Sequence, residues 1–215
     1  PALIDMNGDV VHAWPDVRAR GRARLKSNGN IVLIGADEAV RELTWDGELV
    51  WSYKVEDSED FPHHDLIELK NGNTLVLFRD KSRSKGDGMS DTDYLLELNC
   101  NKVVWRWNSI DYLETAFKEH LIKKHDPDHI NSVEELPENK WSKMGDRRFN
   151  PGNILVSARH LNTIFIIDRA TGEVVWKYSE NLDHQHEARM IPPGLPRAGN
   201  IMLFNNRTSV RHNER

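Results

Sequence analysis

The sequence predicts an all-β fold, and within that class a β-propeller, because two short phrases alternate along the chain. The first is a turn with Gly or Asn followed by an alternating strand that ends in an aromatic residue, and its copies are NGDVVHAW (7–14), DGELVWSY (46–53), NKVVWRW (101–107) and TGEVVWKY (171–178). The second is a Gly-Asn turn followed by an apolar strand, and its copies are NGNIVLI (28–34), NGNTLVLF (71–78), PGNILVS (151–157) and AGNIMLF (198–204). One pair of phrases spans roughly 40 to 45 residues, which is the period of a propeller blade.

Each unit is expected to contain four short antiparallel strands. The Asn-Gly pairs at 28–29 and 71–72 are strong hairpin signals, because a type I′ turn needs positive φ at both central residues. Apolar segments between the phrases supply a further strand in each unit: AVRELTW (39–45), DYLLELN (93–99) and NTIFIID (162–168). The predicted order is therefore strand, turn, strand, loop, strand, turn and a Trp-bearing outer strand.

The tryptophans of the outer strands are predicted to pack between blades. Trp51, Trp105 and Trp176 occupy similar places in three copies of the first phrase. A four-stranded sheet can pack face to face against the next blade through such a side chain. These residues are therefore expected to belong to the structural core.

Counting the phrases gives about four blades, some of them incomplete, within a single propeller domain over residues 1–215. Between the second and third blades, the segment 109–128 has apolar residues at helical spacing, namely Ile110, Leu113, Phe117 and Leu121. This spacing predicts a short amphipathic helix as an insertion. Residues 138–150 are predicted to form a long loop inside a blade.

The composition excludes several classes of partner. The chain has 215 residues, 38% apolar and 29% charged, with a net charge of −5 spread over interspersed acids and bases. Such a pattern offers no basic face for nucleic acid and no polybasic membrane patch. No apolar run approaches the roughly 18 residues of a membrane span, and Cys100 has no second cysteine with which to form a disulfide.

The ends of the chain leave the cellular location open. Residue 1 is a proline that stands directly in a strand-like pattern, and no signal peptide is recognisable. We expect both ends to lie within a longer protein.

Histidines gather at one part of the repeat. The motifs PHHD (62–65), DHIN (128–131) and HQHEA (184–188) each precede a Gly-Asn turn. In a propeller the innermost strands line the central channel, and their starts open on one face. We therefore predict that His63, His64, His129 and His186 converge into one cluster.

An arginine is expected to join the cluster. Arg159 in SARH (157–160) directly follows the strand NILVS. Its planar guanidinium suits phosphate, sulfate or carboxylate, although a surface ion pair is the simpler alternative. Three histidines alone would also suit zinc with an open position. The adjacent arginine favours a tetrahedral anion instead, with one histidine as nucleophile and the others as donors.

In these residues the chain resembles the bacterial arylsulfate sulfotransferase family along nearly its whole length. Five segments follow in family order: LIDMNGDVVHAW, PHHDLIELKNGNTLVL, DHINSVEEL, GNILVSARHLNTIFIIDRATGEVVW and HQHEARMIPPGLPRAGNIMLFNN. The motifs HINS, SARH and QHEA in succession are the most specific part of this resemblance.

The resemblance implies a six-bladed propeller with its active site in the central channel, and sulfuryl transfer from an aryl sulfate to a phenol through a sulfated histidine. His186 would be the nucleophile, while His129 and Arg159 would hold the sulfuryl oxygens. His64, or else His63, would be the remaining donor. Other residues of the same motifs are expected to contact substrate: His184, Asn131, His160 and Arg189. The resemblance implies no cofactor and no metal.

The chain departs from the family pattern in two ways. Six blades need about 250 residues, so we expect about two C-terminal blades to lie outside this chain. The periplasmic members also have a short disulfide that Cys100 alone cannot form. The resemblance makes a periplasmic or secreted location an expectation.

Two other classes of function stay open. Another propeller enzyme, such as a polysaccharide lyase or a metal-dependent hydrolase, could use the same side chains to neutralise a carboxylate and abstract a proton. A propeller that only binds is the third reading, because fold alone does not dictate function. The oligomeric state is not predicted.

Overall fold

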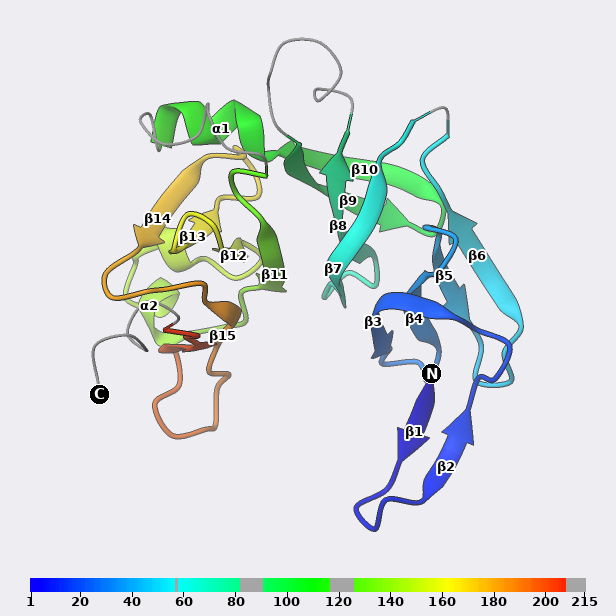
Figure 1. The fold of residues 1–215 in the computed structure, drawn as a ribbon. Helices are drawn as coiled ribbons and strands as arrows, with labels where there is room; N and C mark the ends of the chain where they lie inside the picture. Colours follow the sequence, from blue (N-terminus) through cyan, green and yellow to red (C-terminus); the bar gives the residue numbers. More distant parts are fainter. Residues whose placement is uncertain (57, 82–90, 117–125, 208–215) are drawn as a thin grey trace, which may run out of the picture.

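The computed structural model describes residues 1–56, 58–81, 91–116 and 126–207 (Figure 1). Three four-stranded antiparallel sheets follow one another, each with its strands in chain order. The first contains β3 (Ala19–Leu25), β4 (Ile31–Gly35), β5 (Val40–Leu43) and β6 (Leu49–Tyr53). The second contains β7 (Phe61–Glu68), β8 (Thr74–Asp80), β9 (Thr92–Asn99) and β10 (Lys102–Asn108). The third contains β11 (Ile130–Glu135), β12 (Ile154–Ala158), β13 (Thr163–Ile167) and β14 (Val174–Tyr178).

Two-stranded sheets flank these three blades. One contains β1 (Ala2–Ile4) and β2 (Val10–Ala13), and the other contains β15 (His186–Met190) and β16 (Ile201–Phe204). β2 carries the phrase of an outer strand, and β16 carries the phrase of a second strand. The first pair thus corresponds to the outer half of a blade and the last pair to the inner half.

The innermost strands of successive blades lie side by side. β7 packs beside β3 and β11, and β11 packs beside β15 (Figure 1). This arrangement of four-stranded sheets around shared inner strands confirms the predicted β-propeller.

The predicted insertion begins as a helix. α1 (Ser109–Ala116) directly follows β10; Phe117 and Leu121 lie outside the described residues. The predicted loop at 138–150 contains two short helices, α2 (Lys140–Lys143) and the 3₁₀ helix η2 (Arg147–Phe149). None of the helices among the described residues is long and apolar enough to cross a bilayer.

Asn139 caps α2 in the manner of a strong N-cap residue. Its Oδ1 accepts hydrogen bonds from the backbone N–H groups of Trp141 at 3.0 Å and Ser142 at 3.1 Å. The Trp141 indole then donates to the Gly199 carbonyl at 2.6 Å. This hydrogen bond connects the loop of the third blade to the turn that follows β15.

Tryptophans pack between blades, and Trp107 joins the predicted ones there. Trp51 is buried among residues of the first and second blades. In the second blade Trp107, 2% exposed, is the buried tryptophan, whereas Trp105 is half-buried. Trp105 packs against the same apolar cluster as Trp107. Trp176 packs at the edge of the next apolar cluster.

A buried carboxylate joins four successive inner strands. Asp65 on β7 is completely buried. Its Oδ1 accepts from Arg24 of β3 at 2.9 Å, and its Oδ2 accepts from the Val133 N–H of β11 at 3.2 Å and from Arg189 of β15 at 2.9 Å. Each blade therefore contributes one group to the same carboxylate.

We expect Asp65→Asn to lower the free energy of unfolding by about 3 kcal/mol, because removing one partner of a buried ion pair leaves the others uncompensated. Urea unfolding of the protein measures this change. The matched control is Glu38→Gln, which removes an exposed ion pair with Arg20 and should cost less than about 1 kcal/mol. Equal losses in the two variants would contradict the central role of Asp65.

Candidate functional site

The inner strands are bulged where the histidine motifs lie. The pairing of β7 with β8 shifts between Pro62 and Leu66, and similar shifts occur in the pairings β3–β4, β11–β12 and β15–β16. His64, His129 and His184 have left-handed backbone with φ of 52°, 45° and 52°. Non-glycine residues rarely adopt this conformation, which occurs often at functional sites. Bulges at such places redirect side chains.

The histidines occupy two equivalent rows of the repeat rather than one. In each blade, the residue that precedes the Gly-Asn turn donates the backbone hydrogen bond that closes the turn, and this residue is the reference position for comparing the blades. Five residues before that position, three successive blades have His64, Asn131 and His186. Seven residues before it, the third and fourth blades have His129 and His184. His129 and His186 thus reach the same region from different positions in their strands.

The structure brings five imidazole rings into one row, the histidine cluster. Ring centroids are 4.9 Å apart for His63 and His64, and 4.9 Å for His64 and His129. The row continues from His129 to His160 at 4.5 Å, and from His160 to His184 at 6.2 Å. Five histidines that are spread from position 63 to position 184 of the sequence therefore lie together at one face of the inner strands.

His186 lies beside this cluster. Its Nδ1 is 2.9 Å from the His184 carbonyl oxygen, which can only accept, so Nδ1 carries the proton and Nε2 carries the lone pair. Burial lowers the pKa of His186, and the charges of Arg159 and His129 lower it further against the opposing effect of the carbonyl. At neutral pH the ring is therefore uncharged, and Nε2 makes no hydrogen bond within the described part of the chain.

His64 is also uncharged at neutral pH. Although the residue is exposed, displacement of water and the nearby His63 and His129 lower its pKa to about 4. His63 Nε2 faces the Asp93 carboxylate at 3.0 Å, and the Nδ1 atoms of His63 and His64 are 2.6 Å apart. When the proton of His63 lies on Nε2 toward Asp93 alone, His64 Nδ1 donates to His63 Nδ1, and a lone pair is left on His64 Nε2.

His63 and His64 border a hollow of about 360 Å³ whose other lining residues are Arg20, Gly21, Phe61 and Pro62.

Arg159 reaches the cluster through its neighbour. Its Nη1 contacts His160 Nε2, and His160 Nδ1 is 2.7 Å from the Asp126 carbonyl oxygen. Burial lowers the pKa of His160. A neutral His160 therefore donates to Asp126 and accepts from Arg159.

Two of the expected substrate contacts are engaged in hydrogen bonds within the protein. Asn131 is buried and donates to the Gln185 carbonyl at 2.8 Å. Arg189 donates to Asp65 at 2.9 Å and to Glu187 at 3.2 Å. These contacts assign Arg189 to the Asp65 network rather than to the histidine cluster.

Sequence reasoning missed the acids that contact the cluster. Asp126 Oδ2 contacts His129 Nδ1, and the buried Arg79 pairs with both Asp126 and Asp93. The spacing of Asp126, three residues before His129 in DPDH, was a usable signal. Asp93 and Arg79 lie at ends of strands, where nothing local indicates their partners.

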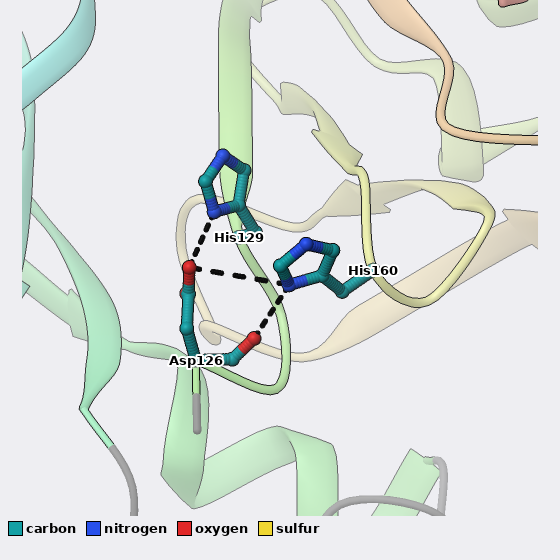
Figure 2. Close-up of side chains that lie close together, drawn as sticks. All are labelled: Asp126, His129 and His160. Carbon is teal, nitrogen blue, oxygen red and sulfur yellow. Dashed lines mark hydrogen bonds and ion pairs between the residues drawn. The ribbon is translucent and has the colours of Figure 1, made fainter. Parts of the chain in front are cut away.

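One group has the composition of a metal site. Asp126, His129 and His160 present ligand atoms that all lie within 4.8 Å of one another (Figure 2). Imidazole and carboxylate are ligands that zinc accepts. The same Nδ1 atoms are engaged in hydrogen bonds with Asp126, however, so the contacts are those of a hydrogen-bonded network.

We expect His64 to titrate near pH 4 in the folded protein. Because its pKa lies below the ordinary 6.5, its contribution to stability is complete above about pH 6.5 and is lost as the pH falls toward 4. An NMR titration of the ring measures the pKa, and His63→Gln should raise it by removing a nearby charge. A His64 ring that titrates near 6.5 would contradict this description.

Comparisons with known proteins address the fold and the family separately. The chain is similar to a protein of unknown function from Bacteroides caccae, with 13% identity, a TM-score of 0.56, and coverage of 94% of this chain and 60% of that one. It is also similar to the WD40 β-propeller domain of Doa1, with 12% identity, a TM-score of 0.51, and coverage of 92% and 52%. The chain thus spans less than two thirds of either structure, and at these identities the likeness supports the fold alone. No curated protein matches.

The family model described as Arylsulfotransferase (ASST) matches residues 1–183. The match includes His63, His64, His129 and Arg159 and ends just before His184. Because it covers most of the sequence, the chain belongs to the arylsulfotransferase family.

Proposed function

We propose that this chain carries the active site of an enzyme that moves a sulfuryl group from an aryl sulfate to a phenolic acceptor, with His186 as the covalent carrier. The observation that carries the proposal is the contact of His186 Nδ1 with the His184 carbonyl, which leaves the lone pair on Nε2 of a ring whose pKa is lowered by burial and by the charges of Arg159 and His129. Family membership supports the reaction class. His186 lies outside the matched residues, so its role rests on the QHEA motif and on this geometry.

In the first half-reaction the His186 Nε2 lone pair attacks the sulfur of the donor. The N–S bond forms as the S–O bond to the aryl group breaks, and the electron pair leaves with the phenolate. The positive charge that develops on the ring is stabilised by the Nδ1–H bond to the His184 carbonyl.

The sulfuryl oxygens need nearby donors while the bonds to sulfur are loose. Arg159 supplies a permanent cation, and its contact with His160 holds it in place. His129 provides the second donor through Nε2 when its ring carries both protons, because Nδ1–H is directed to Asp126.

The second half-reaction reverses the first. The acceptor oxygen attacks sulfur, the Nε2–S bond breaks, and its electron pair returns to His186. The phenolic proton becomes strongly acidic as the new S–O bond forms, and it passes to the lone pair of His64 Nε2 and then to water. This acceptor role differs from the donor role that the resemblance implies for His64, because the ring is neutral at pH 7.

Incubation with 4-nitrophenyl sulfate should add about 80 Da, the mass of one sulfuryl group, to the peptide that contains His186, and phenol should remove it. His186→Asn should abolish the adduct and lower kcat/KM by on the order of 10³-fold or more. Peptide mass spectrometry and nitrophenol release measure these outcomes. The matched control is His12→Asn, a histidine of β2 that stacks on Trp45, and it should react normally. A wild-type protein that gains no adduct and releases no nitrophenol would overturn the proposal.

Arg159→Ala should lower kcat by about 10²- to 10³-fold, because the lost donor acts on charge that develops during transfer. Arg159→Lys should recover part of the rate, since it retains the charge without the planar fork. Single-turnover kinetics measure the transfer step directly. A change confined to KM would instead indicate that Arg159 binds donor and transition state equally.

A further inference from the structure

Two carboxylates that the proposed mechanism does not use contact the histidine cluster. Arg79, 8% exposed, donates through Nε to Asp93 at 2.7 Å and pairs through Nη2 with Asp126 at 2.9 Å. Burial opposes the ionisation of Asp126, but its contacts with His129 and Arg79 outweigh that effect and lower its pKa to about 2. Asp126 is therefore a carboxylate throughout the neutral range.

Asp126 faces two imidazoles through two different acceptors (Figure 2). Its Oδ2 contacts His129 Nδ1, and its backbone carbonyl lies 2.7 Å from His160 Nδ1. An ionised carboxylate and a carbonyl can only accept, so both rings carry a proton on Nδ1. In each ring Nε2 is the nitrogen that remains free to face other groups.

We infer that Asp126 is a positioning residue, which holds Nδ1 of His129 and His160 so that both rings turn Nε2 toward the reacting sulfuryl group and its arginine. This inference rests on the proposed function. His160 uses its Nε2 lone pair to orient Arg159. His129 is left with Nε2 as the nitrogen that faces a sulfuryl oxygen, and Nε2 donates to that oxygen when the ring carries both protons.

Asp93 extends the arrangement to the other end of the cluster. It accepts from His63 Nε2 at 3.0 Å, and His63 Nδ1 then faces His64. Through two carboxylates, Arg79 is thus linked to the orientation of three imidazoles, those of His129, His63 and, through His63, His64. A buried network of this kind is rigid only when each member has its partner.

A metal ion is the competing reading of the Asp126, His129 and His160 group. A dication there would need both Nδ1 atoms deprotonated. It would also lie close to the Arg79 guanidinium, which is 2.9 Å from the same carboxylate. Both requirements favour the hydrogen-bonded network.

The test is Asp126→Asn in protein labelled with ¹⁵N-histidine. Long-range ¹H–¹⁵N spectra at pH 7 should show protonated Nδ1 for His129 in the wild type and a smaller protonated fraction at Nδ1 in the variant. With 4-nitrophenyl sulfate, kcat should fall by about 10- to 100-fold with a smaller change in KM, because orientation of a donor is lost rather than the nucleophile.

The matched control is Asp37→Asn, since Asp37 also pairs with an arginine, Arg41, and also has a pKa of about 2. Its spectra and rates should match the wild type. Unchanged His129 tautomers in Asp126→Asn would overturn the inference, as would stoichiometric Zn²⁺ binding that Asp126→Asn abolishes. If the wild type releases no nitrophenol, the proposed function fails while the spectra still decide the role of Asp126.

Discussion

The carboxylate of Asp65 is the interaction on which the arrangement of the inner strands depends. Apolar clusters between blades provide most of the burial, but such contacts are non-directional and leave some freedom to slide. Hydrogen bonds from Arg24, Val133 and Arg189 to one buried group have definite lengths and directions. Arg22 adds a further charge at 3.6 Å. Four blades are therefore aligned at the level where their histidine motifs begin.

The same kind of interaction recurs at the histidine cluster. Arg79 balances Asp93 and Asp126, and these two acids determine which nitrogen of His63 and His129 carries a proton. Left-handed backbone at several histidines costs conformational energy. The hydrogen-bonded network and the surrounding sheets hold that backbone in place, so the bulges can direct imidazoles toward one another.

The chemistry proposed here follows from charge balance. Burial lowers the pKa of His64 and His186, and nearby cationic groups lower it further, which keeps both rings neutral, as a nucleophile and a proton acceptor must be. The permanent cation is assigned to Arg159, which meets the sulfuryl anion. Membership of the arylsulfotransferase family is consistent with a site that combines neutral imidazole rings with one permanently charged guanidinium.

The sequence by itself determined the β-propeller, the order of its strands and the region where histidines meet, because turn chemistry and alternation are local and repeat from blade to blade. Only the tertiary structure decided that Trp107 rather than Trp105 is buried, and that Arg189 joins Asp65, 124 residues away. It also revealed the links from Asp126 and Asp93 to the cluster. The depth at which a tryptophan is buried and the pairing of buried charges both depend on contacts between blades that no local pattern encodes.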